Sequence, residues 1–350
     1  MNRQPLVTLP AALTLPDPSA TTPAGPPARY VLGVDGGATK TLAAVLDVEH
    51  RLLHLGHAGP SNEDAVGPRL AVKALLDASD AALAGASIPE ADLAAAVLAV
   101  AGTDTHSIAG HLREMRPGSW ILVNDVVSAW ATATAAQPGV GVISGTGSNV
   151  FGVGRLGAET RAWRAGGWGH LLGDEGSGYW LGAQSLKAAL HDRDGSGPAT
   201  ALSHAALRFF AAPSIEALAA SVYTTPLTKA EVAAFAVETS RLAAQGDPVA
   251  RELYSRAAFE LGAQIRAVIE HTALSGPFPV GLIGSAFKAG PVFVDPLRHI
   301  IHAIAPEAHV APVHMPPVGG SLLLALRACS SEHAISPEEL TLLVDRALAP

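Results

Sequence analysis

The sequence contains a single cysteine, Cys329, among 350 residues. One cysteine excludes an intramolecular disulfide, a zinc site built from several cysteines and an iron–sulfur cluster held within one chain. No run of about 18 apolar residues is present, which argues against a membrane-spanning helix. Pro5, Pro10 and Pro16 interrupt the early apolar stretch, so it cannot form the helical core of a secretory signal. These absences lead us to expect a cytoplasmic protein.

Basic residues are also few, with 23 Lys and Arg against 31 Asp and Glu and a formal net charge of −8. Without a basic excess, nucleic acid is not an expected partner, and without a long apolar run neither is a membrane. The 14 histidines are scattered and form no helix-spaced ligand pair, so a metalloenzyme is weakly supported. Hydrophobic residues make up 49% of the chain, enough for a sizeable core. A function on a small molecule fits this composition best.

The order of predicted elements repeats along the chain. From Tyr30 we expect three strands joined by very short connections, which only antiparallel neighbours can use, followed by helix, strand, helix and strand. The three-strand pattern begins again at Val140. The repeat predicts an α/β protein with two domains of similar build that face each other across a cleft.

The domain boundaries follow from this repeat. Residues 1–29 hold seven prolines among small residues, the composition of a disordered leader. We expect the first domain at 30–130, completed by a C-terminal helix at about 325–350. The second domain, with a helical insertion, is expected at 131–324, and the boundary near 126–138.

A glycine-rich turn, Gly33-Val34-Asp35-Gly36-Gly37-Ala38-Thr39-Lys40-Thr41, lies between the first two predicted strands. This position excludes a Walker A loop and a dinucleotide fingerprint, because both lead from a strand into a helix. Gly36, Gly37, Thr39 and Lys40 can still direct backbone N–H groups and a cation at phosphate oxygens. An ordinary β-turn is the alternative, since Asp-Gly is a strong turn signal.

Two further glycine segments favour nucleotide binding. Gly145, Thr146 and Gly147 occupy the same place in the second half as the first glycine turn does in the first half. Two such hairpins on facing domains would form a nucleotide clamp, although two unrelated turns would look the same in sequence. The segment 281–290 follows a buried strand and opens a helical stretch, which suits contact with adenosine or the α-phosphate. Its candidate ligands are Gly284, Ser285 and Lys288.

The three loops, in this order, resemble the actin-like sugar-kinase/heat-shock ATPase superfamily. The branch resembled contains N-acetylglucosamine kinases, bacterial glucosamine kinases and the BadF/BadG/BcrA/BcrD-type ATPases. The resemblance runs from about Tyr30 to Ala328 and is most specific in Gly166-Gly167-Trp168-Gly169-His170-Leu171-Leu172-Gly173-Asp174-Glu175-Gly176-Ser177. It implies two actin-like (ribonuclease H-like) ATPase domains with Mg-ATP in the cleft. It also implies γ-phosphoryl transfer to an amino sugar, with N-acetylglucosamine and its 6-phosphate favoured, and a homodimer is compatible with it.

Three aspartates follow predicted strands, where an α/β sheet presents ligands. The resemblance implies that Asp104 is the catalytic base, and a cap for the helix beginning near Ser107 is the alternative. Asp35 and Asp125 are the candidates for holding Mg²⁺ through water, because magnesium keeps much of its hydration shell. Each could instead be a turn residue or a helix cap.

The resemblance also assigns sugar contacts to residues from four segments. Glycines among them let the main chain approach a ligand closely. By itself, Asn62 fits a turn and Trp168 fits a core position. The complete set is Asn62, Ser148, Asn149, Gly167, Trp168, Gly169 and Asp174.

Several alternative functions share these loops. Glucosamine, N-acetylmuramate or another hexose are alternative acceptors, and a non-kinase ATPase or a sugar-binding regulator are alternative classes. A dehydratase activator needs cysteines for a cluster shared between subunits, and Cys329 is poorly placed for that. A repressor needs a helix-turn-helix domain, which a proline-rich leader cannot supply. Asp104 and all three loops are present, which favours an active kinase.

Overall fold

The computed structural model describes residues 7–16, 28–102, 105–331 and 333–349. The strands of the first sheet are β1 (Tyr30–Gly36), β2 (Thr41–Asp47), β3 (Leu52–Ala58), β4 (Leu93–Val100) and β5 (Trp120–Asn124). The strands of the second sheet are β6 (Gly139–Ser144), β7 (Ser148–Leu156), β8 (Glu159–Gly166), β9 (Pro279–Ile283) and β10 (His309–Pro312).

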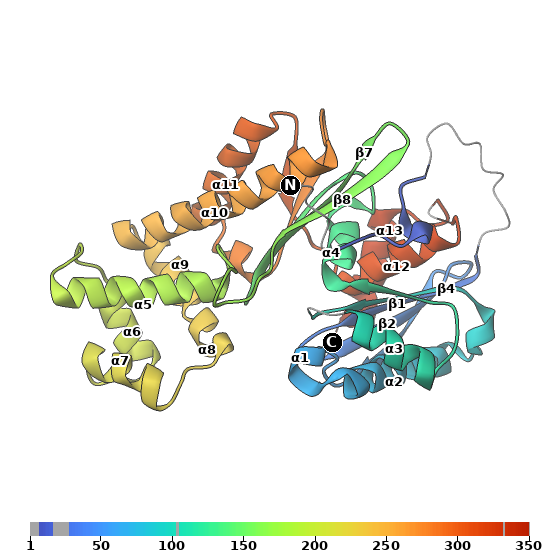
Figure 1. Cartoon of the computed structure of the whole chain (residues 1–350), viewed down its shortest axis with the longest axis horizontal. Helices are drawn as coiled ribbons and strands as arrows, with labels where there is room; N and C mark the ends of the chain where they lie inside the picture. The colour runs from blue at the N-terminus through green and yellow to red at the C-terminus, as the bar shows by residue number, and fades with distance from the viewer. Residues whose placement is uncertain (1–6, 17–27, 103–104, 332, 350) are drawn as a thin grey trace.

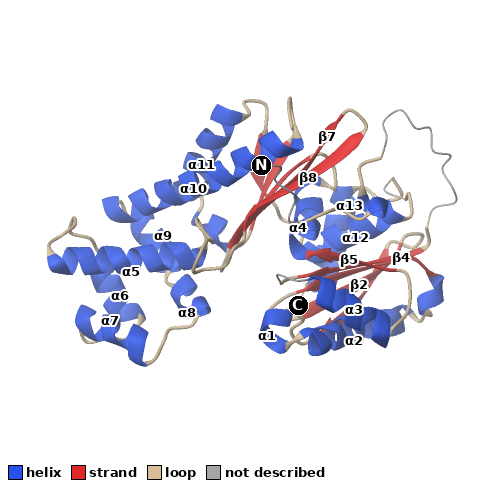
Figure 2. Cartoon of the chain, viewed as in Figure 1, coloured by secondary structure: helices blue, strands red, loops and turns tan. Residues whose placement is uncertain are grey.

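Helices precede, separate and follow these strands (Figures 1 and 2). Those of the first half are η1 (Ala11–Leu13), α1 (Glu63–Val66), α2 (Pro68–Ala86), η2 (Glu90–Asp92), α3 (Thr105–Met115) and α4 (Asp125–Thr134). The helical insertion of the second half contains α5 (Gly178–Asp194), α6 (Leu202–Phe209), α7 (Ile215–Thr224), α8 (Lys229–Ala234), α9 (Ala236–Ala244) and α10 (Pro248–Thr272). The remaining helices are η3 (Ser285–Ala289), α11 (Pro291–Ile304), α12 (Pro317–Ala328) and α13 (Pro337–Leu348).

The two sheets have the same topology. The first has the strand order β3-β2-β1-β4-β5, and the second, taken from its β8 edge, has the order β8-β7-β6-β9-β10. In each, three antiparallel strands are followed by two that run parallel to the first. The repeated α/β pattern predicted from the sequence is therefore confirmed.

Each sheet is covered in part by a helix from the other half of the chain. α4 follows β5 directly but packs against β6 and β9, whereas α12 packs against β1 and β4. We expect a domain boundary near residues 126–138, and the structure has most of α4 in this segment. Its residues are almost all buried, so no polar face reveals a helical period. The C-terminal helices α12 and α13 both pack on the first sheet, and α13 contacts β3. The exact division into domains stays an interpretation.

Part of the predicted leader packs against the folded body. Leu13 is fully buried and Leu15 nearly so, in the same apolar cluster as Leu322 of α12. The backbone N–H of Leu15 donates a hydrogen bond of 3.1 Å to Oγ1 of Thr160 on β8. Residues 7–16 therefore differ from the expectation of a disordered leader, and the rest of residues 1–27 lies outside the described part.

The molecule has two lobes, the first built on the first sheet and the second on the second sheet, and the long helix α10 belongs to the second lobe. Its first turn is fixed by Asp247, whose carboxylate accepts a hydrogen bond of 2.9 Å from the N–H of Ala250, and by Pro248 at the first helical position. One face of α10, including Leu261 and Ile265, is buried in the core of this lobe. Neither α10 nor any other helix of the described ranges is long and apolar enough to cross a membrane.

Candidate active site

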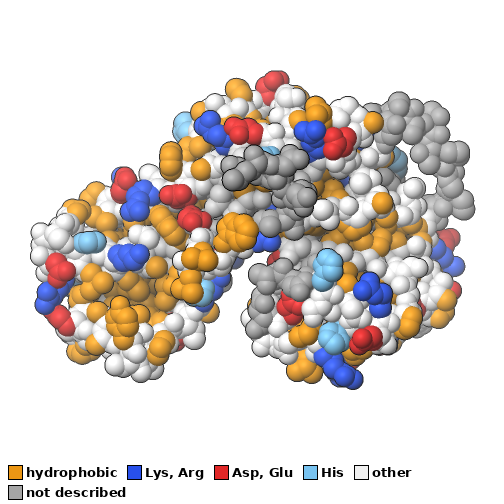
Figure 3. Space-filling model, in the orientation of Figure 1, with side chains coloured by type: hydrophobic (Ala, Val, Ile, Leu, Met, Phe, Trp, Pro, Cys, Tyr) orange, Lys and Arg blue, Asp and Glu red, His pale blue; other side chains and the backbone are white. Residues whose placement is uncertain are grey.

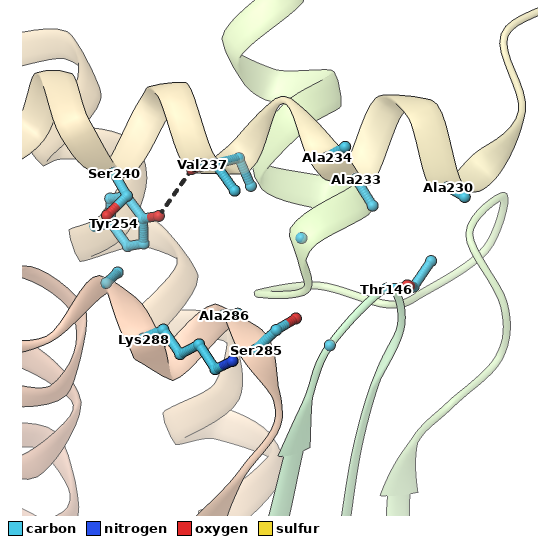
Figure 4. Close-up of a pocket in the computed structure, with 14 residues that line it drawn as sticks. Thr146, Ala230, Ala233, Ala234, Val237, Ser240, Tyr254, Ser285, Ala286 and Lys288 are labelled. Atoms are coloured by element: carbon cyan, nitrogen blue, oxygen red, sulfur yellow. Dashed lines mark hydrogen bonds between the residues drawn. The ribbon is translucent and has the colours of Figure 1, made fainter. Parts of the chain in front are cut away.

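A mostly apolar cavity of about 510 Å³ lies in the second lobe, a size typical of small-molecule sites. Its walls come from the glycine turn between β6 and β7, from helices α8, α9 and α10, and from η3. Tyr254 and Ser240 lie at one end of the cavity. Lys288 and Ser285 lie along one side, across from Ala233 and Val237 (Figure 4). Its lining comprises Gly145, Thr146, Gly178, Ala230, Ala233, Ala234, Ala236, Val237, Ser240, Tyr254, Ser285, Ala286, Lys288 and Ala289.

Two of the predicted phosphate loops meet at this cavity. Gly284 has φ of +117°, and a Cβ there would lie 2.2 Å from the carbonyl oxygen of Ser144. Only glycine allows the third loop to approach the second this closely. The contact brings Ser285 and Lys288 to the same cavity as Gly145 and Thr146. Two segments that are far apart in the sequence therefore meet at one cavity, which supports the prediction of a nucleotide site.

A second, polar cavity of about 370 Å³ borders the first. Gly145 and Thr146 line both cavities. The molecular surface is hollowed between the helical insertion and the first lobe, in the region where the two halves of the chain face each other (Figure 3). The lining comprises Asn62, Ala101, Gly102, Asn124, Asp125, Val126, Ile143, Gly145, Thr146, Gly147, Ser148, Asn149, Arg164, Gly167, Gly169, Asp174 and Lys229.

Hydrogen bonds fasten the segment 174–178 to the glycine turn of residues 144–148. The Ser148 hydroxyl donates to the carbonyl oxygen of Glu175 at 2.7 Å, and the Ser148 N–H donates to Oδ1 of Asp174 at 3.2 Å. The Gly178 N–H donates to the carbonyl oxygen of Gly145 at 2.7 Å. Ser177 then caps α5 by accepting from the N–H of Trp180. The most specific sequence segment and the second phosphate loop thus form one unit.

Two buried polar atoms of the second cavity have no hydrogen-bond partner within the described part of the chain. They are Oδ1 of Asn149 and Nε of Arg164. Another atom of the Arg164 guanidinium donates to the carbonyl oxygen of Gly167 at 2.5 Å. Because buried polar groups are normally paired, the two free atoms favour a polar ligand in this cavity.

Two half-buried carboxylates of the first lobe are candidates for binding a cation: Asp125 lines this cavity, and Asp35 lies on β1. Burial raises the pKa of Asp35 to about 6, and the charge of Lys40 opposes that shift. The pKa of Asp125 is also raised to about 6, first by burial and then by the charge of Asp35, while Arg164 lowers it. The negative charge of Asp35 thus acts on Asp125, and a cation beside the two carboxylates would favour their ionised forms.

These carboxylates fit magnesium better than a metal caged by protein ligands. Among residues 7–16, 28–102, 105–331 and 333–349, no group of three or more His, Cys, Asp or Glu side chains could hold a metal ion. Magnesium is typically held by one or two carboxylates together with substrate phosphates and water. Asp35 and Asp125 match that donor set, provided that a phosphate group is bound beside them.

The first glycine hairpin, with Gly36, Gly37, Thr39 and Lys40, joins β1 to β2. Its Gly37 N–H donates to the carbonyl oxygen of Lys40, and its Gly37 carbonyl accepts from the N–H of Ser61. The hairpin thereby adjoins Asn62, which lines the polar cavity. Neither cavity is lined by these four hairpin residues themselves, so their role in nucleotide binding stays a prediction.

The other predicted residues divide into three groups. Asn62 lines the polar cavity and also caps α1, because its Oδ1 accepts from the N–H of Ala65 at 3.2 Å. Trp168 is 61% exposed, which excludes the core position, while Gly167 and Gly169 beside it line the cavity. Asp104 lies outside the described residues, although Ala101 and Gly102 just before it line the cavity.

Two cations of the polar cavity were not predicted. Arg164 lies on β8 and Lys229 begins α8, in the helical insertion. Lys229 Nζ lies 2.7 Å from Oδ2 of Asp174, across 55 residues of sequence. Neither belongs to a glycine motif, and no local pattern indicates that a helix of the insertion returns to the sugar segment.

Comparison with known proteins agrees with the fold and with the loops. The chain is 29% identical over 307 residues to the N-acetylmuramic acid/N-acetylglucosamine kinase of Clostridium acetobutylicum, covering 86% of this chain and 99% of that protein. It is 28% identical over 319 residues to the N-acetyl-D-glucosamine kinase of Dictyostelium discoideum, covering 85% and 98%. A solved structure from Chromobacterium violaceum, provisionally named an N-acetylglucosamine kinase, has a TM-score of 0.66 and 28% identity, covering 86% of this chain and 100% of that one.

The match to a family model extends over both sheets. Residues 32–324 match the model of the BadF/BadG/BcrA/BcrD ATPase family, which includes all three glycine loops and both cavities. The resemblance stated from the sequence is therefore confirmed, as is the fold with two actin-like ATPase domains. With its duplicated sheets and its loops joined around two adjoining cavities, this chain belongs to the BadF/BadG/BcrA/BcrD ATPase family.

Proposed function

We propose that the protein is an ATP-dependent kinase that transfers the γ-phosphoryl group to an amino-sugar hydroxyl. N-acetylglucosamine is the favoured acceptor and N-acetylglucosamine 6-phosphate the product. The proposal agrees with the names of the two curated relatives. A cytoplasmic location, a homodimer and the absence of nucleic acid or membrane partners stay predictions.

The observation that carries this proposal is the junction between the two cavities. The first is mainly apolar and suits adenosine, and the second presents amides, carboxylates and backbone groups that suit a sugar. Gly145 and Thr146 belong to both. A nucleotide in the first cavity would therefore extend its phosphates along this glycine turn toward a sugar in the second.

Phosphoryl transfer depends on positioning and on neutralising charge. We propose that Asn62, Asn149 and Asp174 orient the sugar, with the backbone of Gly167 and Gly169 against it. Asp35 and Asp125 would hold Mg²⁺ through water, and the ion would neutralise the phosphates. Gly36, Gly37, Thr39, Lys40 and Gly147 would contact the phosphates, and Gly284, Ser285 and Lys288 the nucleoside end.

The proposed reaction is a direct displacement. The sugar oxygen forms a bond to the γ-phosphorus, and the bond between that phosphorus and the β–γ bridging oxygen breaks. ADP leaves with the electron pair, and Asp104 takes the hydroxyl proton. A positioned base contributes about 10²–10⁴ in rate, so Asp104→Asn should lower kcat by that order while leaving the sugar KM similar.

A coupled assay of ADP release tests the function. Purified protein is incubated with Mg-ATP and with N-acetylglucosamine, glucosamine, N-acetylmuramic acid or glucose in separate reactions. We expect release that depends on sugar and is fastest with N-acetylglucosamine. ADP release that no sugar accelerates would support a non-kinase ATPase instead, and the absence of nucleotide binding would support a sugar-binding regulator.

N-acetylmuramic acid is the second candidate acceptor. It carries a carboxylate that N-acetylglucosamine lacks, and the polar cavity contains two cations, Arg164 and Lys229. The Clostridium acetobutylicum relative carries both sugars in its name. A higher kcat/KM for N-acetylmuramic acid than for N-acetylglucosamine would reverse the order of preference.

A further inference from the structure

We propose that Lys229 is a further catalytic residue, whose ammonium group contacts the phosphoryl group as it passes from nucleotide to sugar. The inference rests on the proposed kinase function. It assigns a role in the chemistry to the helical insertion, which otherwise supplies walls of the apolar cavity.

The position of Lys229 marks the junction between the cavities. Lys229 lines the polar cavity, whereas the next residue, Ala230, lines the apolar one. The glycine turn shows the same division, because Gly145 and Thr146 line both cavities and Gly147 only the polar one. A terminal phosphate that crosses from one cavity to the other would pass between this turn and the start of α8.

The backbone that carries Lys229 is firmly held. Thr228 and Glu231 form a capping box, in which the Glu231 N–H donates to the Thr228 hydroxyl at 3.2 Å and the Thr228 N–H donates to the Glu231 carboxylate at 2.7 Å. α8 also packs tightly on α5, since a Cβ at Gly182 would lie 2.0 Å from the carbonyl oxygen of Val232. A fixed backbone limits the positions that the lysine ammonium can reach.

The Lys229 ammonium group pairs with Asp174 and keeps further N–H donors. Its Nζ lies 2.7 Å from Oδ2 of Asp174, whose side chain is 5% exposed, while the Lys229 side chain is 36% exposed. An ammonium group has three N–H donors, and Asp174 accepts one of them. No other hydrogen-bond partner of Lys229 occurs in the described part of the chain. The remaining donors are available to an anion in the polar cavity.

This chemistry matches the demand of phosphoryl transfer. Negative charge is spread over three equatorial oxygens of the transferring group as the sugar oxygen approaches and ADP departs. A preoriented cation stabilises that charge where it develops, and it keeps its own proton throughout. Arg164 also lines the polar cavity, but it lies on β8, whereas Lys229 begins the helix whose next residue, Ala230, lines the apolar cavity.

The test compares Lys229→Met and Lys229→Arg with the wild type and with Lys187→Met. Lys187 lies on α5 and lines neither cavity, so it serves as the matched control. Steady-state kinetics with N-acetylglucosamine and with N-acetylmuramic acid give kcat and KM for each variant. We expect Lys229→Met to lower kcat by about 10²–10³, as for loss of one stabilising donor, with both sugars and with a similar sugar KM. Lys229→Arg should retain more activity, and Lys187→Met should match the wild type.

Two alternative roles predict other results. If Lys229 only neutralises Asp174, its replacement in an Asp174→Asn background would cost no further activity, and this result would overturn the proposal. If Lys229 binds the carboxylate of an acidic sugar, the loss would be confined to N-acetylmuramic acid, which would also overturn it. A kcat of Lys229→Met within twofold of the wild type would do the same.

The folding of the variants is checked by thermal unfolding. If Lys229→Met unfolds, Lys229→Gln repeats the test, because it keeps an amide donor for Asp174 without the positive charge. Failure of the kinase function itself would look different: wild-type protein would then show no sugar-dependent ADP release with any acceptor.

Discussion

The side chain of Asn124 connects the ends of two neighbouring strands in the first lobe. Its Nδ2 donates a hydrogen bond of 3.0 Å to the carbonyl oxygen of Gly102, just after β4, and its Oδ1 accepts one of 3.2 Å from the N–H of Val126. Asn124 thus caps α4 and also binds the backbone of Gly102, which precedes Asp104 by two residues in the sequence. Asn124 and Gly102 also line the polar cavity.

Replacing Asn124 should separate these two contributions. Asn124→Ala should lower the free energy of unfolding through loss of the cap, by about 0.5–2 kcal/mol, and of the link to Gly102, by about 0.5–1.5 kcal/mol. Asn124→Ser keeps a good cap but is too short to reach Gly102. Denaturant unfolding should therefore rank the variants wild type, Ser, Ala, and both should raise the sugar KM. Equal stability of Ser and Ala would contradict a role for the cap.

The glycine turn offers a test of nucleotide binding. A Cβ at Gly145 would meet no atom within 4 Å, so Gly145→Val should leave the melting temperature nearly unchanged. If phosphates pass along this turn, the new side chain should raise the KM for ATP at least tenfold. Gly284→Ala is the contrasting variant, because its Cβ would collide with Ser144 and should lower stability as well. Unchanged ATP kinetics in folded Gly145→Val would argue against the phosphate path.

The stability of the free protein should depend on pH through Asp35 and Asp125. Both have a folded-state pKa of about 6, above the usual 3.8. Between about pH 4 and 6 the folded chain therefore binds more protons than the unfolded chain, so these groups make the protein less stable as pH rises through this window. In Asp125→Asn, the free energy of unfolding should fall less steeply as pH rises through this window.

Magnesium should oppose this effect. A bound cation favours the ionised carboxylates, so Mg²⁺ with ADP should raise the melting temperature more at pH 7.5 than at pH 5. Thermal unfolding across pH, with and without Mg²⁺ and ADP, measures both effects. An equal rise at both pH values would argue against Asp35 and Asp125 as the magnesium site.

The packed part of the leader yields a test of stability. Leu13 is fully buried although it precedes the first strand. Leu13→Ala should cost about 2–5 kcal/mol, as for other buried leucines. Ala12→Ser, at an exposed neighbour, is the control and should have little effect. A disordered leader would instead make both variants indistinguishable from the wild type in a denaturant titration.

The sequence predicted the sheets well because their signals are local. Very short connections forced β1, β2 and β3 to be antiparallel, and the same pattern recurred in β6, β7 and β8. α4 was missed because its buried residues have no amphipathic period. β10 was missed because it is a mostly exposed, four-residue strand at the sheet edge that ends in proline.

The site was predictable only where glycines marked it. The turns around Gly145, Gly167 and Gly284 indicated close approach of the backbone, and the structure brings them to two adjoining cavities. Arg164 and Lys229 are single cations outside these motifs. The position of Lys229 depends on how the helical insertion folds back against the second sheet, which no short-range pattern encodes, whereas Arg164 is one residue of the ordinary strand β8.

The central claim is phosphoryl transfer to an amino sugar, and identification of the product tests it most directly. The protein is incubated with Mg-ATP and N-acetylglucosamine, and the phosphorus NMR spectrum is followed over time. We predict the growth of a phosphate-ester signal, coupled to the protons at C6 of the sugar, in a one-to-one ratio with ADP. A spectrum that shows ADP and inorganic phosphate but no sugar phosphate, with N-acetylglucosamine or any other sugar of the panel, would contradict the account.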